Sequence, residues 1–303
     1  MKKLIIAALA VAAVAGCQKQ GNVVEEQSTP IIVKAGFSVT ADTKAINAEG
    51  TGFVQGEDVF RIWAYDGVDA HANLYDNIAN HQVDMKANNE FHLNEPKFYP
   101  VNGNKLYFYA YAPAANTVSH GTGLADATAT FTLNGGQDII YANDVTGYDK
   151  TGDAQPDLEF NHKMTCIEFH VIADENFGDG MLLKNISILS QPNQGVMNVV
   201  DGDINFSGST TYSNAIADVE IEKTEKLVAT VYISPEQTSN TFQVQATASE
   251  TVFPAANVTL VPKDGKTEGV KYKVILTFKA KEIIPTASIV PWVDGEDVNV
   301  DIQ

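Results

Sequence analysis

The chain has 303 residues, 44% of them hydrophobic, which is enough for two cores because single domains mostly run to about 100–200 residues. Its 38 acidic residues outnumber 20 lysines and arginines, and the resulting formal charge of −18 argues against nucleic acids and anionic lipid surfaces as partners. With only two cysteines, no disulfide framework holds the chain, so its stability must come from packing.

The first residues have the pattern of a lipoprotein signal peptide. Lys2 and Lys3 precede an uncharged stretch, residues 4–16, which ends in small residues directly before Cys17. A basic start, a short apolar middle and a small-residue end are typical of secretory signals, and the stretch is shorter than the roughly 20 residues that cross a bilayer as a helix. The letters VAGC at its end predict a signal peptide over 1–16 and a lipid on Cys17. A secretory signal without lipid is the alternative.

The rest of the chain has the texture of an all-β protein. Residues 17–30 are polar and without period, which predicts a flexible tether. After them, short segments rich in Val, Ile, Phe, Tyr and Thr alternate with Gly, Asn, Asp and Pro clusters, as in β-sandwiches. Strands are expected at 31–40, 58–65, 90–98, 105–111, 128–133, 138–142, 164–172, 182–189, 195–200, 203–206, 227–234, 241–248, 257–261, 272–281 and around 289–302.

Two short stretches carry sharper local predictions. In KLYFYAYAP, residues 105–113, aliphatic and aromatic residues alternate with tyrosines, so both faces of this strand are substantial and we expect it to be central. Its aromatic face is interpreted as core. The pair Asp201-Gly202 is a strong signal for a β-hairpin.

A turn-rich loop is expected at 143–157. It holds four acids, Asp144, Asp149, Asp153 and Asp157. Calcium requires several oxygens at ligand spacing, and these acids are spread more widely than an EF-type loop allows. A solvated connection between domains is therefore favoured over a calcium site. The resulting prediction is two consecutive β-sandwich domains, at 31–157 and 158–303.

The sequence shows no motif for catalysis, for a metal or for a cofactor, so we do not expect an enzyme. The histidines are His71, His81, His92, His120, His162 and His170, and none has metal-site spacing. His162 and His170 flank a predicted strand, where a packed or surface histidine is the common explanation. Cys166 lies between apolar residues of that strand, which favours an inert buried thiol.

Several segments together resemble one family. The lipoprotein signal is followed by AGFSVTADTKA, KLYFYAYAP, DIIYAND, LEFNHKMTCIEFHV and the closing YKVILTFKAKEIIPTASIVPWVDGEDVNVDI. In this order the chain resembles, over essentially its whole length, the fimbrillins of Bacteroidales, the subunits of type V pili. The resemblance implies two transthyretin-like β-sandwich domains and export as an outer-membrane lipoprotein to the cell surface. It also implies that a trypsin-like protease removes the first strand, after which the C-terminal strand of the next subunit fills the groove.

The sequence contains a candidate for the strand that is removed. The polar, glycine-bearing stretch ADTKAINAEGTG follows that strand, and an accessible loop belongs there. Where the family usually has an arginine, this chain has Lys44, so cleavage after Lys44 by a lysine-accepting protease and no cleavage are both open; Arg61, the only arginine, lies in a predicted strand. The apolar residues of the candidate strand share one face: Ile31, Val33, Ala35, Phe37 and Val39.

The C-terminal segment is a candidate donor strand. Val298, Val300 and Ile302 alternate with polar residues, which gives a strand one apolar face. The partner would then be the next subunit of a head-to-tail polymer. The alternative is that these three residues fill an edge of their own sheet.

Three roles remain open at this point. The chain is expected to be a shaft or tip subunit of a fimbria that contributes to adhesion to a host or bacterial surface ligand. An anchor subunit, which keeps its lipid, is a second reading. A glycan-binding surface lipoprotein is a third, with Trp63, Tyr65, Tyr107 and Tyr109 as its exposed platform, although core packing is favoured for Trp63.

Overall fold

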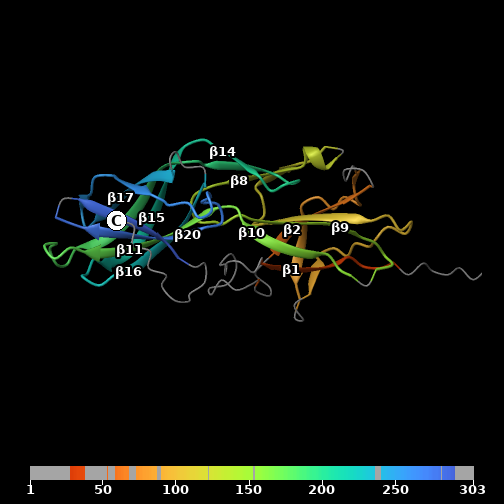
Figure 1. Cartoon of the computed structure of the whole chain (residues 1–303), viewed down its shortest axis with the longest axis horizontal. Coiled ribbons are helices and arrows are strands. Elements are labelled where there is room, and N and C mark those ends of the chain that lie inside the picture. The colour runs from red at the N-terminus through yellow and green to blue at the C-terminus, as the bar shows by residue number, and fades with distance from the viewer. Residues whose placement is uncertain are drawn as a thin grey trace, which may run out of the picture.

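The computed structural model describes residues 28–37, 53, 59–67, 73–86, 90–121, 123–152, 154–235, 240–280 and 282–290. Over these residues the chain is all-β, as predicted, and it includes the 3₁₀ turn η1 (Leu124–Asp126). No helix in this part of the chain is long and apolar enough to cross a membrane. Figure 1 shows an elongated molecule, with strands of the N-terminal half at one end and strands of the C-terminal half at the other.

The first sheet closes on itself. Its strands, in order, are β3 (Asn73–Leu74), β2 (Val59–Asp66), β4 (His81–Met85), β5 (Phe91–Leu93), β1 (Ile32–Phe37), β10 (Asp157–His162), β9 (Ile140–Tyr148) and β6 (Leu106–Ala112). Because β2 also pairs with β6, all of these strands except β3 form a ring. β1 and β10 are parallel, although they are more than a hundred residues apart in the sequence.

One apolar cluster, which we call the first core, fills this ring. Alternate residues of each strand point inward, as the two-residue period of a strand requires. Every strand of the ring, or its immediate flank, contributes a buried side chain: Ile31, Val33, Phe60, Ile62, Val83, Phe91, Phe108, Ile140, Leu158 and Phe160.

A small sheet joins the two halves of the chain. Its strands, in order, are β14 (Ile204–Ser207), β13 (Gln194–Asn198), β8 (Thr128–Thr132) and β7 (Thr117–Ser119). The turn between β13 and β14 is the predicted hairpin, with Gly202 at φ +74°, a conformation that favours glycine. The Tyr141 hydroxyl of β9 also donates to the carbonyls of Val199 and Val200, at 3.0 and 2.9 Å. The halves are therefore held by backbone pairing as well as by side chains.

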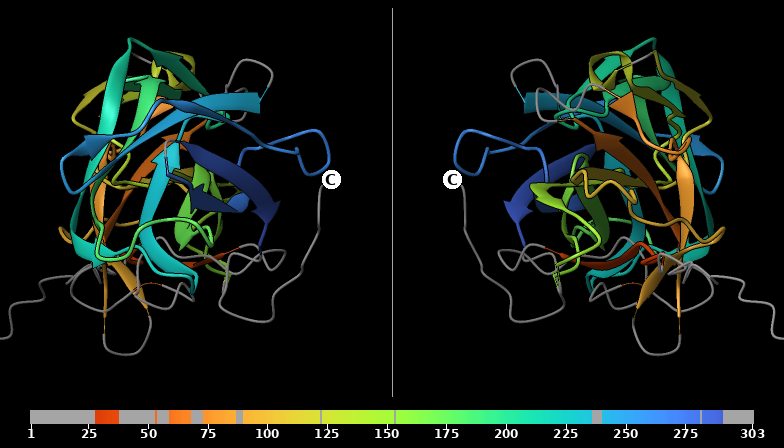
Figure 2. Two further views of the ribbon diagram at one scale, coloured as in Figure 1. Left: turned by 90° about the vertical axis from the view of Figure 1, so that its left-hand side faces the viewer. Right: turned by 90° about the vertical axis from the view of Figure 1, so that its right-hand side faces the viewer.

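The C-terminal half forms a sandwich of two sheets. The strands of one sheet, in order, are β16 (Lys226–Ile233), β11 (Thr165–Ala173), β20 (Lys271–Phe278) and β21 (Ile283–Ile289). The strands of the other are β15 (Thr210–Glu220), β12 (Leu182–Gln191), β17 (Thr241–Ala248) and β18 (Thr251–Val252), and β19 (Ala256–Thr259) also pairs with β17. Buried residues of both sheets, such as Phe169, Leu276, Ile188 and Val244, belong to one cluster, which we call the second core. The end-on views of Figure 2 show strands on all sides of the interior.

Strand β6 serves both cores. Leu106, Phe108 and Ala110 lie in the first core. Tyr109 and Tyr111 lie in the second, where the Tyr111 ring meets Phe131 edge-on with centroids 5.6 Å apart. Because β6 pairs with both β2 and β9, the prediction of a central strand with two buried faces is confirmed.

The predicted loop at 143–157 is partly strand. β9 continues to Tyr148 and β10 begins at Asp157. Asp144 is buried and accepts hydrogen bonds from the Tyr148 hydroxyl at 2.6 Å and from the backbone N–H groups of Thr146 and Asp157. Burial opposes ionisation of Asp144, but these hydrogen bonds outweigh it and lower its pKa. The carboxylate of Asp144 thus serves to hold the end of β9.

Several strands were not expected from the sequence: β3, β4, β7, β10, β15, β18 and β21. β15 is largely polar, and β21 contains Pro285, so neither has the usual pattern of a buried strand. Apart from its first two residues, the strand expected around 289–302 lies outside the described residues. The division into domains at 157 and 158 stays a prediction, and β10, which crosses it, belongs to the first sheet.

Candidate functional site

Strand β1 lies between two partner strands of the first sheet. On one side it pairs antiparallel with β5, where Ile32 is opposite His92. On the other it pairs in parallel with β10, from Lys34 opposite Asp157 to Phe37 opposite Phe160. β1 therefore fills a slot with a hydrogen-bonding edge on each side.

The residues just before β1 extend this pairing. The Ile31 N–H donates to the Lys97 carbonyl at 2.8 Å, and the Tyr99 N–H donates to the Thr29 carbonyl at 2.9 Å. Pro30 pairs with Phe98 in an isolated bridge. The segment from Thr29 to Phe37 is thus bound along its length.

The side chains of β1 follow the predicted alternation. Ile31 and Val33 are buried in the first core, with 3% and 1% of their surface exposed, and Ala35 and Phe37 pack against it. The predicted apolar face is therefore confirmed up to Phe37. Whether the strand is removed stays a prediction.

Phe37 lies in a group of rings at the C-terminal end of β1. Its ring centroid is 5.2 Å from that of Phe53, 6.2 Å from that of Phe160 and 5.9 Å from that of His162. We call Phe53, Phe160 and His162 together the Phe37 pocket. Phe53 was missed in the sequence, since it stands alone in a polar, glycine-bearing stretch; its neighbours in sequence give no strand period.

His162 rests on a buried carboxylate. Its Nδ1 contacts Oδ2 of Asp138, and both residues are buried. Burial raises the pKa of Asp138, and the imidazole opposes that rise only in part. The prediction of a packed histidine is confirmed, and the site consists of a ring pocket over a desolvated acid–imidazole pair.

The other residues singled out in the sequence have structural roles. His170 contacts Glu225 at 2.7 Å on the outer face of β11. Cys166 is buried and not in a disulfide, and burial raises the pKa of its thiol, as expected of an inert residue. Within the described ranges, no group of three His, Cys, Asp or Glu residues could hold a metal ion.

The aromatic platform of the alternative glycan-binding reading is not an exposed surface. Trp63, Tyr65 and Tyr109 are at most 2% exposed and belong to the second core. Tyr107 is partly buried against the same core. Core packing, the favoured reading of Trp63, is correct, because these residues share the second core with Phe131 of the small sheet.

The remaining predicted site residues lie outside the described residues: Cys17, Lys44, Val298, Val300 and Ile302. Lipidation, cleavage and strand donation at these positions stay predictions. The structure contributes the slot of β1, on which strand removal and strand donation would depend.

Comparison with known families identifies the chain. A model of the family described as fimbrillin-like matches residues 43–292. The chain belongs to the fimbrillin-like family. A model of the prokaryotic membrane lipoprotein lipid attachment site matches residues 1–18, a stretch that includes Cys17. A search of the curated proteins found no match.

Solved structures share the fold of this fimbrillin-like protein. A candidate cell adhesion protein from Bacteroides uniformis is 20% identical, with a TM-score of 0.60 over 87% of this chain and 99% of the other. One from Bacteroides ovatus is 17% identical, with a TM-score of 0.61 over 89% and 99%. A fimbrial protein from Bacteroides vulgatus is 16% identical, with a TM-score of 0.57 over 87% and 99%. At these identities the likeness establishes the fold.

Membership of the family sets the class of function. The fimbrillin-like family is structural rather than catalytic, and the match to a lipid attachment site over residues 1–18 indicates a lipoprotein with a membrane anchor. The feature whose function has to be explained is therefore the slot of β1 and not a catalytic centre.

Proposed function

We propose that this fimbrillin-like lipoprotein is a structural subunit of a cell-surface fimbria, assembled by donor-strand exchange after proteolysis, and that it contributes to adhesion. The observation that carries the proposal is the position of β1 between β5 and β10, with Ile31 and Val33 in the first core. A strand in such a slot can be replaced by another strand with the same apolar alternation.

Removal of β1 would open the ring of the first sheet. The facing edges of β5 and β10 would lose their partners, and unpaired strand edges bind other extended chains. The sites of Ile31 and Val33 would be left empty, and burial of such side chains contributes about 1.5–3 kcal/mol each. A new strand that enters the slot restores both the backbone pairing and the apolar burial, and this gain supplies the driving force for assembly.

The sequence supplies the other parts that this mechanism needs. The polar stretch that contains Lys44 follows β1 and offers a cleavage position. Val298, Val300 and Ile302 repeat the two-residue spacing of Ile31 and Val33. A head-to-tail contact of this kind does not close and therefore makes fibres. We expect two transthyretin-like β-sandwich domains and a place at the outer membrane before assembly.

One observation favours a variant of this role. Lys44 stands where family members usually have an arginine, so an arginine-specific protease would leave β1 in place. A subunit that keeps both β1 and its lipid would anchor the fimbria, accept no donor strand, and offer only its own C-terminal segment.

Proteolysis of the purified protein tests the proposal. Full-length lipoprotein in detergent is treated with a lysine-specific protease, and the products are examined by N-terminal sequencing and negative-stain electron microscopy. The expected result is a new N-terminus at Ala45 followed by filaments. Lys44→Ala is the matched control and should give neither. Complete cleavage at Lys44 with loss of β1 but no filaments or larger oligomers would contradict the proposal.

A further inference from the structure

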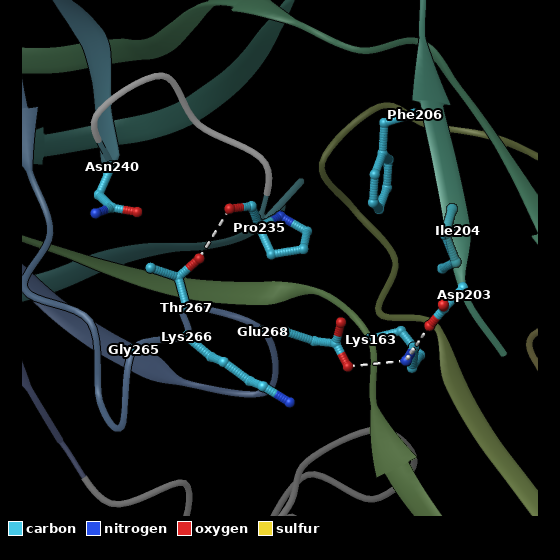
Figure 3. A pocket seen from close by; sticks show the side chains of 10 residues that line it. All are labelled: Lys163, Asp203, Ile204, Phe206, Pro235, Asn240, Gly265, Lys266, Thr267 and Glu268. Atoms are coloured by element: carbon cyan, nitrogen blue, oxygen red, sulfur yellow. Dashed lines mark hydrogen bonds and ion pairs between the residues drawn. The ribbon is translucent and has the colours of Figure 1, made fainter. Parts of the chain in front are cut away.

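A cavity outside the slot of β1 is formed where the small sheet meets the sandwich (Figure 3). It has a volume of about 380 Å³ and is lined by four separate segments of the chain. They are the turn before β11, strand β14 with its preceding residue, the residues that flank 236–239, and the loop before β20. Its lining includes Lys163, Asp203, Phe206, Pro235, Asn240 and Glu268.

An ion pair fixes the polar wall of this cavity. The Lys163 side chain is 10% exposed, and its ammonium lies 2.8 Å from Oε1 of Glu268 and 3.9 Å from Oδ1 of Asp203. Because Lys163 already has these two acids, it is not a vacant site for a phosphate, and the two carboxylates would repel one. The acids instead present acceptor oxygens toward the cavity, together with the amide of Asn240.

The loop that carries Glu268 is held in place. The Thr267 hydroxyl donates to the Pro235 carbonyl at 2.9 Å, and the Thr165 hydroxyl donates to the Thr267 carbonyl at 2.8 Å. The Gly269 N–H donates to the Met164 carbonyl at 3.0 Å. These bonds fix the cavity wall before any ligand arrives, which lowers the entropic cost of binding.

The opposite wall is apolar. In Figure 3 the rings of Phe206 and Pro235 lie across the cavity from Lys266, with Glu268 and Lys163 below them. Phe206 is partly buried and lines the cavity, so its side chain can contact a ligand there. An aromatic face opposite fixed carboxylate and amide groups suits a molecule that has an apolar C–H face and a rim of hydroxyls.

We propose that this cavity binds a saccharide of one or two sugar units. Its volume lies at the lower end of the roughly 300–1,000 Å³ typical of ligand sites, so a longer chain would extend into solvent. Glu268 and Asp203 accept hydrogen bonds from sugar hydroxyls, Asn240 both donates and accepts, and the ring stacks on Phe206. The proposal is independent of strand exchange, since β1 contributes no residue to the cavity.

Ligand-observed NMR tests this site. Full-length protein in detergent is mixed separately with galactose, N-acetylglucosamine, lactose and glucuronic acid, and saturation transfer to the sugar C–H protons is recorded. At least one of these sugars should show transfer. Phe206→Ala should weaken its binding at least tenfold, and Asn240→Ala several-fold, with thermal melting used to confirm that each variant is folded.

Phe98→Ala is the matched control, because Phe98 is 41% exposed and lies outside the cavity. This variant should bind the sugar as the unchanged protein does. Saturation transfer to none of the four sugars would overturn the proposal. Binding that survives both cavity variants, or that is lost equally in Phe98→Ala, would overturn it as well. None of these outcomes bears on filament formation, which is measured separately.

Discussion

The ring of Phe37 lies nearly parallel to the imidazole of His162, with centroids 5.9 Å apart and planes inclined by 15°. Phe37 is the last residue of β1, and His162 is the last residue of the neighbouring β10. The contact covers a histidine that rests on the buried carboxylate of Asp138. Any strand that replaces β1 must cover the same pocket.

Phe37→Ala should lower the free energy of unfolding by about 2 kcal/mol, less than the 3–5 kcal/mol of a fully buried phenylalanine, because Phe37 is only partly buried. Phe37→Leu, which keeps an apolar side chain in the pocket, should cost clearly less. Urea denaturation followed by fluorescence measures both variants. Equal stability of Phe37→Ala and the unchanged protein would show that the ring contacts contribute nothing.

Asp138 should make the fold less stable as the pH rises above about 4. Its carboxyl ionises near the ordinary value of 3.8 in the unfolded chain but retains its proton to higher pH in the folded one, because burial raises its pKa. Over that window the folded state binds more protons, so the free energy of unfolding falls with pH and levels off above the folded pKa.

Asp138→Asn should remove this part of the pH dependence and leave the protein at least as stable at pH 7. Urea denaturation from pH 4 to pH 8 measures the difference between the two proteins. A difference that stays constant across the whole range would contradict a raised pKa. Glu250→Gln, a change of an exposed acid, provides the control for general charge effects.

Cys17 should be the site of lipid attachment. The signal that ends in VAGC and the lipid attachment match over 1–18 both point to this sulfur. Cys17→Ala should leave an uncleaved precursor that no longer incorporates labelled palmitate. Cys166→Ala, which removes the other cysteine, should label normally. Continued labelling of Cys17→Ala would place the lipid elsewhere.

The C-terminal segment should bind to the neighbouring subunit rather than to a sheet of its own subunit. Deletion of residues 298–303 removes Val298, Val300 and Ile302, and a donor role predicts an unchanged melting temperature together with loss of filaments after protease treatment. Substitution of the same three residues by aspartate should have the same effect at constant length. A markedly lowered melting temperature would assign the segment to its own sheet.

Sequence periodicity was sufficient where a strand has two buried faces or a clean alternation. β6, with aliphatic residues on one face and tyrosines on the other, and β1, with Ile31 and Val33, could both be assigned in this way. A polar strand such as β15 could not be assigned in this way. Its residues show no clear two-residue apolar period, and the strand is defined by its pairing with β12.

The candidate site could be predicted only in part. The apolar face of β1 is visible in the sequence, but its parallel pairing with β10 is a long-range contact that no local pattern encodes. Phe53 and Asp138 were missed for a similar reason, since Phe53 acquires its role from the ring of Phe37 and Asp138 from the pairing of β9 with β10. The cavity lined by Phe206 and Glu268 likewise depends on four segments that are distant in the sequence.

The most direct test of strand exchange is peptide binding to the protease-treated protein. A fluorescent peptide with the sequence of residues 291–303 is titrated, with anisotropy as the readout, into protein cleaved after Lys44 and freed of β1, and into the intact Lys44→Ala variant. The cleaved protein should bind the peptide and the intact variant should not, and a peptide with aspartate at 298, 300 and 302 should bind neither. Equal binding to both proteins, or binding to neither, would contradict the account.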